Sequence, residues 1–462
     1  MSDAITIAQT ERGEYHEPID DRKIMRSIWS MGYPSMIGFA ATNLYTVADM
    51  FWVSRVGADA VAAITIFAAF YWVIGSVNQI AGVGSVAVIS RRFGERDFPR
   101  TETAIVEAFA LKTILALVFG TIGFFFTPAI VRLLGADGAV YDYAVGYGRI
   151  MMLGLVFNFN TYTLFTALRS INHPRWAMMI MVGSTIFNAT LDPFLIFGWW
   201  GMPALGVKGA AVASVIGYML TISFGLTLFF RGAFRLRLSM DSIRRMHSST
   251  QWQMLKIGMP SGVSSVSYSL GRLVVTPMIA HFGNPAIAIY GAGNRVVELA
   301  VMLVVGLELG MSPLVGHALG AGDKLRAWVV AKKSVILAVL MMSALGVMMF
   351  FAARPVTAIF FEGAPYDALG LVFFRVCAVA FPFIGLFIIL EGAFGGAGDT
   401  VPTMVVGVIH AWVLEIPLVW LFAYNFDFGP TGVWWGQVIA IAGAGLMLLY
   451  WFSRKRWLER VV

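Results

Sequence analysis

The chain has 462 residues, of which 58% are hydrophobic and 13% charged, whereas an ordinary soluble domain has roughly 25% charged residues. With a mean hydropathy of +0.77, this composition excludes a soluble globular protein, a disordered chain and a disulfide scaffold, and it indicates that most residues lie in lipid. The net charge of +7 says less than the positions of the charges, and the single Cys377 cannot form an internal disulfide.

Long apolar runs between charged and turn residues predict membrane-spanning helices. A span needs about 20 apolar residues, so a chain of this length accommodates roughly 12 helices with their loops. The runs lack the alternation of barrel strands, so the expected fold is an all-α polytopic membrane protein. In chain order, we expect helices at about 28–54, 60–90, 104–130, 143–169, 175–198, 207–230, 257–281, 286–318, 334–352, 369–394, 401–424 and 431–453.

The positive charges predict the orientation of these helices. An even number of spans places both termini on one side, and alternating the loops puts 24 Lys and Arg on that side and 4 on the other. Cytoplasmic loops carry an excess of Lys and Arg. We therefore expect a multi-pass protein of the plasma membrane, the bacterial inner membrane, with both termini in the cytoplasm.

The two halves of the sequence repeat at an offset of 226 residues, which predicts two lobes. The correspondence includes Gly32, Pro34 and Ser35 with Gly258, Pro260 and Ser261, and Gly94, Asp97 and Arg100 with Gly320, Asp323 and Arg326. Each half holds six spans, so the lobes should be related by a pseudo-two-fold axis along the membrane normal, with a binding site between them. The expected division is a cytoplasmic tail at 1–27, an N-lobe at 28–230, a cytoplasmic connector at 231–256, a C-lobe at 257–453 and a cytoplasmic tail at 454–462. We also expect the first helix of each lobe to bend near Pro34 and Pro260, because proline removes a backbone hydrogen bond.

Four segments stand out along the chain. They are YPSMIGFAATNLYTVADMFWVSRVGADAVAA in the first helix, NATLDPFLIFGWWGMPALGVKGAAVAS across the fifth and sixth, and the C-lobe stretches VGHALGAGD and GAFGGAGDTVPTM. In their order and spacing, these segments resemble the MATE (multidrug and toxic compound extrusion) transporters. The resemblance covers about residues 25–453 and favours the DinF-like branch. The seventh helix, GMPSGVSSVSYSLGRLVVTP, lacks the acid of the other main branch.

The resemblance implies a cation-coupling site in the N-lobe. The corresponding positions hold Asp49, Tyr45, Asn188, Asp192 and Ser214, with the backbone carbonyl of Ala210 as a further oxygen. Oxygen ligands of this kind would bind H⁺, or Na⁺ at Asp49, Asn188, Asp192 and Ser214.

The residues themselves support that reading. Asn188 and Asp192 are four residues apart, as are Tyr45 and Asp49, so each pair shares a helical face. An acid within a span is costly, and it is by default a sign of function. If the two helices meet, two close carboxylates cannot easily both be ionised, so they can share one proton or bind one cation. The structural alternative is that Asp192 caps a helix at Pro193 while Asp49 lies in an aqueous vestibule.

The C-lobe candidates for substrate contact or a second relay are Glu298, Glu308 and Arg295, with Arg149 in the N-lobe. Glu298 and Arg295 are three residues apart and could simply pair on one helix, and Arg272 could approach them. Arg149 could be a partner of the N-lobe acids. Glu391 and Glu415 are the remaining acids within spans.

These observations predict a secondary active multidrug efflux transporter, which exports amphipathic or cationic organic compounds in exchange for H⁺ or Na⁺. The absence of catalytic motifs and of a phosphate-binding loop argues against an enzyme and against ATP as the driving force. We expect no cofactor and no nucleic acid, and as partners only small organic substrates and the lipid bilayer, with the chain acting as a monomer. The alternative is a lipid-linked saccharide flippase of the same superfamily, which Arg149, Arg272 and Arg295 would favour by binding an anionic head group.

Overall fold

The computed structural model describes residues 21–234, 236–238, 240–360 and 364–462, so most of the expected N-terminal tail lies outside the described residues. Within those ranges the chain is helical and forms no strand. The elements are α2 (Asp21–Ser54), α3 (Ala58–Gly94), α4 (Phe98–Leu133), α5 (Gly138–Leu153), α6 (Leu155–Ser170), α7 (Pro174–Phe197), η1 (Trp199–Gly201), α8 (Val207–Phe230), α9 (Met240–Arg244), α10 (Ser248–Ala280), α11 (Asn284–Gly320), α12 (Lys324–Phe360), α13 (Ala364–Ala397), α14 (Val401–Val408), η2 (Ile409–Glu415), α15 (Ile416–Trp420), η3 (Leu421–Asn425), α16 (Gly429–Ser453) and η4 (Arg456–Glu459).

These elements form the twelve expected spans. In the described part of the chain, nine helices are long and apolar enough to cross a membrane, with α14 to η3 counted as one, and α5 with α6 forms a tenth that is bent by 54°. The remaining two are α2 and α10, which have 34 and 33 residues and are more polar than the others. Each is the first helix of its lobe. Polar residues on these two helices suit the lining of a substrate path between the lobes.

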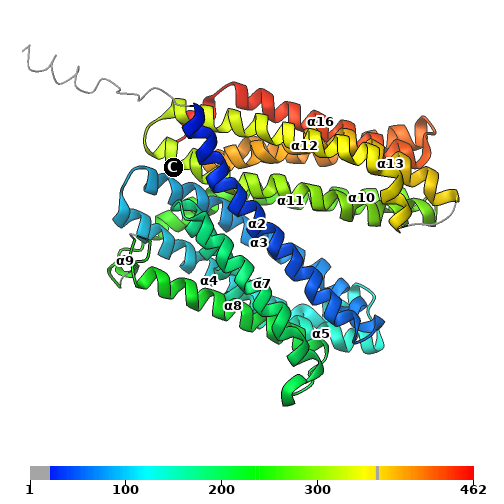
Figure 1. Cartoon of the computed structure of the whole chain (residues 1–462), viewed down its shortest axis with the longest axis horizontal. Coiled ribbons are helices and arrows are strands. Elements are labelled where there is room, and N and C mark those ends of the chain that lie inside the picture. The colour runs from blue at the N-terminus through cyan, green and yellow to red at the C-terminus, as the bar shows by residue number, and fades with distance from the viewer. Residues whose placement is uncertain (1–20, 235, 239, 361–363) are drawn as a thin grey trace, which may run out of the picture.

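The helices form two groups, which are the predicted lobes (Figure 1). The group of α10, α11, α12, α13 and α16 lies on one side, and α4, α5, α7 and α8 lie on the other. The chain passes from one group to the other through α9, which lies at the same end of the molecule as the C-terminus (Figure 1). We call this end the basic end, because the Arg- and Lys-rich loops alternate onto it.

Reciprocal close contacts between the lobes show the pseudo-two-fold relation. A Cβ added to Gly94 would lie 2.3 Å from the carbonyl oxygen of His317, and one added to Gly320 would lie 2.1 Å from that of Arg91. Adding the repeat offset of 226 to Gly94 and Arg91 gives Gly320 and His317, so the two contacts are equivalent. At both, the backbone of α3 lies directly against the backbone of α11. Gly84 makes a similar contact with Met254 of α10. The contacts lie toward the basic end, where the lobes are therefore closed against each other.

Helix α2 runs across both groups of helices (Figure 1) and contacts α7 in one and α11 in the other. Its first half packs on α11, where a Cβ on Gly306 would lie 2.3 Å from the Cα of Met36. Its second half follows α7, and Thr185 donates a hydrogen bond of 3.1 Å to the carbonyl oxygen of Ala41. A movement of α2 would therefore change packing contacts in both lobes.

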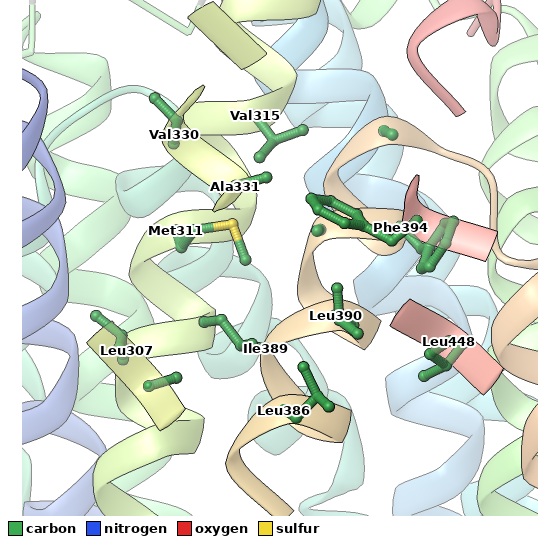
Figure 2. Close-up of a cluster of buried hydrophobic side chains, with 14 of the residues drawn as sticks. Leu307, Met311, Val315, Val330, Ala331, Leu386, Ile389, Leu390, Phe394 and Leu448 are labelled. Atoms are coloured by element: carbon green, nitrogen blue, oxygen red, sulfur yellow. The ribbon is translucent and has the colours of Figure 1, made fainter. Parts of the chain in front are cut away.

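Each lobe has its own apolar core. In the C-lobe, side chains from α11, α12, α13 and α16 interlock around Met311, Ile389 and Phe394 (Figure 2). In the N-lobe the core extends into the connector, whose Leu236 and Leu238 are buried. The connector is also tied to α4 by polar bonds, since Glu102 accepts from the backbone N–H of Arg237 at 2.8 Å and Glu107 accepts from that of His247 at 2.6 Å. The connector thus packs as part of the N-lobe.

Several helices are longer than expected; α12, for example, runs over Lys324–Phe360 instead of 334–352. α2 begins at Asp21 and α10 at Ser248, each several residues before its apolar run, because polar turns extend the helix beyond the membrane. The expected single helix at 143–169 is broken at Gly154. Both α2 and α10 continue as helices through Pro34 and Pro260, and the bend there stays a prediction.

Candidate functional site

Three helices of the N-lobe bring the predicted coupling residues together. α2 carries Tyr45 and Asp49, and it packs along α7, which carries Asn188 and Asp192. α8 also packs on α7, where the absence of a side chain at Gly209 allows a close approach: a Cβ there would lie 2.2 Å from the carbonyl oxygen of Leu195. The remaining predicted residues, Ala210 and Ser214, are buried on α8, which contacts α2 as well.

The polar side chains of this site are buried and make contacts with one another. Asn188 and Asp192 are fully buried, and Asp49 is 7% exposed. The amide of Asn188 donates to Asp192 Oδ1 at 3.3 Å, as their four-residue spacing predicts. The hydroxyl of Tyr45 donates to Ser214 Oγ, which joins α2 to α8. Asp49 lies near enough to Asp192 for the two charges to interact.

A tryptophan stabilises α7 where proline interrupts it. Pro193 lies within the helix and has no N–H, so the carbonyl oxygen of Ala189, four residues earlier, lacks its helical donor. The indole N–H of Trp52 on α2 donates to that oxygen at 3.1 Å. The bond replaces the missing one and fixes α2 against α7 beside Asp49. Asp192, which directly precedes Pro193, therefore lies at a point where α7 depends on α2.

Three oxygens of the site have no hydrogen-bond partner. They are Asp49 Oδ1, Asn188 Oδ1 and Asp192 Oδ2, and each is buried. An unpaired buried acceptor costs free energy, so three on neighbouring residues indicate a position for a proton or a cation. Carboxylate, amide and hydroxyl oxygens suit a hard cation. Within the described ranges, no three His, Cys, Asp or Glu residues are grouped as for a bound transition metal.

The sequence did not indicate two tyrosines beside the site. Tyr218, on α8, has its ring centroid 6.3 Å from that of Tyr45, and Tyr147, on α5, lies within electrostatic reach of Asp49. Tyr218 follows Ser214 by four residues, which could have placed it on the same helical face. Tyr147 has no such signal. Ala210 lies one turn before Ser214 and is fully buried, and its role as a ligand stays a prediction.

The C-lobe candidates lie in different surroundings. Glu298 forms ion pairs with Arg295 at 3.2 Å and with Arg272 at 3.6 Å, and its side chain is 47% exposed. The expected pairing of Glu298 is therefore present. Glu415 is buried and accepts a hydrogen bond of 2.9 Å from Gln437, in a π-helical turn.

The two other candidates for a second relay lie apart from both clusters. The exposed Arg149 stacks its guanidinium over the ring of Phe124 at 5.2 Å and pairs with no acid within the described ranges. Glu308, on α11, is half-buried and lies against Gly392 of α13. Its charged neighbours are Glu391 and, from the N-lobe, Arg169.

The family model named MatE matches residues 34–194 and 260–421, once in each lobe. The chain belongs to the MatE family. Among curated relatives of this MatE chain, the "Multidrug export protein MepA" of Staphylococcus saprophyticus is 26% identical and the alignment covers 94% of this chain and 95% of the relative. The "FAD transporter" of Shewanella oneidensis is 27% identical over 87% and 88% of the two chains. The solved structure "Vibrio cholerae MATE transporter VcmN in the bent form" has a TM-score of 0.87 at 17% identity, with 95% and 98% covered, and it shows the same two-lobe fold.

Proposed function

We propose that this MatE chain is a secondary active efflux transporter that exports amphipathic, often cationic organic compounds in exchange for H⁺ or Na⁺. The observation that carries the proposal is the set of three unpaired buried oxygens on Asp49, Asn188 and Asp192. Relatives named as multidrug export proteins support the direction and the class of substrate. The coupling ion is the second substrate, and no cofactor takes part.

The orientation follows from the charges. The basic end faces the cytoplasm of a plasma membrane, the bacterial inner membrane, because Lys and Arg accumulate on the cytoplasmic side. Both termini then lie in the cytoplasm, and lobes that touch at the basic end are closed on the cytoplasmic side. The chain works as a monomer, since each lobe supplies one wall of the path.

The coupling step is a change in repulsion within the N-lobe. When both are ionised, Asp49 and Asp192 repel each other across the contact of α2 with α7. A proton or Na⁺ removes that repulsion and lets α2 settle against α7. Because α2 also packs on α11, the shift reaches the other lobe. Binding drives this change only through a different affinity of the ion for the two conformations.

The test is transport by purified protein in proteoliposomes under an imposed H⁺ or Na⁺ gradient. Asp49→Asn resembles the protonated form and should fold normally, but it should lose gradient-driven ethidium efflux, as should Asp192→Asn. Ser214→Ala should weaken the Na⁺ dependence more than the H⁺ dependence. The matched control is Asp59→Asn, an exposed acid in the first turn of α3. Wild-type efflux by Asp49→Asn would place the coupling elsewhere, and Glu308 would be examined next.

The flippase alternative needs several arginines facing one cavity. Here Arg272 and Arg295 are engaged by Glu298, and Arg149 lies against an aromatic ring. Their arrangement favours organic efflux. The names of the relatives include both multidrug export and FAD transport, so similar chains are named for substrates of more than one kind.

A further inference from the structure

Two cations are buried in the N-lobe without an ion-pair partner. Lys112 of α4 is 1% exposed and Arg169 of α6 is 6% exposed. Within the described ranges, no acid lies within 4.0 Å of either side chain and neither makes a side-chain hydrogen bond. The Lys112 ammonium lies beside Gly82 of α3, where an added Cβ would be 3.7 Å from Nζ. Each cation is within electrostatic reach of the other, so each is made less stable by its neighbour.

A buried charge needs an anion or hydrogen bonds to compensate for the loss of water. In this conformation the compensation is remote and comes from the other lobe. Glu308 of α11 acts on Arg169 across the boundary between the lobes, and Glu391 of α13 acts on Glu308. Each of these charges acts electrostatically on the next, and we call the series from Lys112 of the N-lobe through Arg169 and Glu308 to Glu391 of the C-lobe the charge line.

The charge line crosses the boundary between the lobes, so separation of the lobes at the basic end would part Arg169 from Glu308. Beside it, the imidazole of His317 on α11 lies 2.6 Å from the carbonyl oxygen of Ser170, the residue after Arg169. When the lobes part at the basic end, α11 leaves α6 and takes Glu308 with it. Lys112 and Arg169 then remain as two like charges without Glu308 near them, with Arg169 next to the boundary residue Ser170 and Lys112 behind it in the N-lobe.

We infer that Lys112 and Arg169 form an anion-recognition site, which binds a carboxylate or phosphate group of a transported compound when the lobes are open at the basic end. The guanidinium of Arg169 suits both groups, because its fork matches two oxygens at once. When the lobes close, the carboxylate of Glu308 supplies a remote negative charge that partly compensates for the absence of that anion. The inference rests on the proposed efflux function and extends its substrates to compounds with an anionic group.

The experiment compares export of two dyes by the same proteoliposomes, the anionic carboxyfluorescein and the cationic ethidium. The wild type should export both. Lys112→Gln and Arg169→Gln should lower the ratio of carboxyfluorescein to ethidium export by about tenfold, the loss of one charge-assisted hydrogen bond. Lys112→Arg should restore the ratio. Lys332→Gln, at an exposed lysine of α12, is the matched control and should leave both rates unchanged.

A second measurement tests a substitution that should strengthen anion binding. Carboxyfluorescein binding to purified protein should tighten in Glu308→Gln, because the competing carboxylate is gone, and should weaken with added salt. Repeating the assay in phosphatidylcholine alone and with phosphatidylglycerol separates a dissolved anion from a lipid head group, since only the latter would compete in the second membrane.

Two outcomes would overturn the inference: ethidium export without carboxyfluorescein export by the wild type, or an unchanged ratio of the two dyes in Lys112→Gln, whether both rates are kept or both fall equally. Either of these leaves the proposed efflux function intact. Failure of the wild type to export either dye would overturn that function as well.

Discussion

Replacing Gly84 by alanine tests whether the lobes must approach to backbone contact at the basic end. A Cβ at this position would lie 1.9 Å from the carbonyl oxygen of Met254 and 2.8 Å from its Cα. Ordinary contacts of a Cβ begin at 3.4 Å, so α3 and α10 would have to separate by about 1.5 Å. The obstacle is backbone, which cannot turn aside as a side chain can.

The energetic cost falls on the conformation that is closed at the basic end. Overpacking of this kind costs about 1–3 kcal/mol, which is about a 5- to 150-fold change in an equilibrium constant. Gly84→Ala should therefore favour the conformation that is open at the basic end. The matched control is Gly75→Ala in the same helix, where an added Cβ meets nothing within 4 Å. A helical Gly→Ala change without a clash is neutral or slightly stabilising.

The assay is labelling of a cysteine at the boundary. Ser170 is fully buried there, so Ser170→Cys in a Cys377→Ser background reports when the lobes part. A membrane-impermeant maleimide added from the side of the basic end should label this cysteine at least about fivefold faster in Gly84→Ala than in Gly75→Ala, and ethidium efflux should fall only in Gly84→Ala. Equal labelling and equal efflux in the two variants would refute the argument that these glycines set the closed state.

Two further predictions concern stability. Trp52→Phe should lower the stability of the protein in detergent by about 1–3 kcal/mol, because the carbonyl oxygen of Ala189 would lose the indole N–H that replaces the donor missing at Pro193. Trp72→Phe, at a 79% exposed residue, should have no effect, and equal melting temperatures of the two variants would contradict this. Asp323→Ala should lower the free energy of unfolding by about 1 kcal/mol, because Asp323 accepts a hydrogen bond of 2.8 Å from the backbone N–H of Arg326 at the start of α12. Asp323→Asn should keep most of that stability, and an equal loss in both variants would show that the cap is not the cause.

Much of the fold could be predicted from the sequence because the bilayer sets it. Apolar runs of sufficient length determined the spans, and the repeat determined the two lobes. The bend at Gly154 could not be predicted, since an isolated glycine in an apolar run is compatible with a straight helix. The glycine meets a tertiary constraint instead, since a Cβ at Gly154 would lie 2.2 Å from the side chain of Val215 of α8. The π-helical turn that holds Glu415 has no sequence signal either.

The N-lobe site was predictable for a related reason. Acids within spans are rare because they are costly, and four-residue spacing places Asn188 with Asp192 on one face. The meeting of α2 with α7 is a tertiary fact, and so is the contribution of Trp52. The line from Lys112 to Glu391 was missed because its members belong to four different helices and share no spacing along the chain. Residue spacing along the sequence can identify a site on one helix, but it cannot identify a site whose residues come from several helices.

The two halves of the chain have the same residues at the glycine contacts between the lobes, but they differ at the candidate ion site. At the boundary, the reciprocal glycine contacts require the same residue in both halves, because any side chain would separate the two backbones. Inside the lobes, the repeat equivalents of Asp49 and Ser214 are Val275 and Ala440, which can bind neither a proton nor Na⁺. Symmetric contacts let the two lobes move against each other in equivalent ways, whereas the ion site that we propose in one lobe alone would make the movement respond to a single binding event. One ion bound at that proposed site would bias the whole transporter, provided that α2 transmits the change to α11.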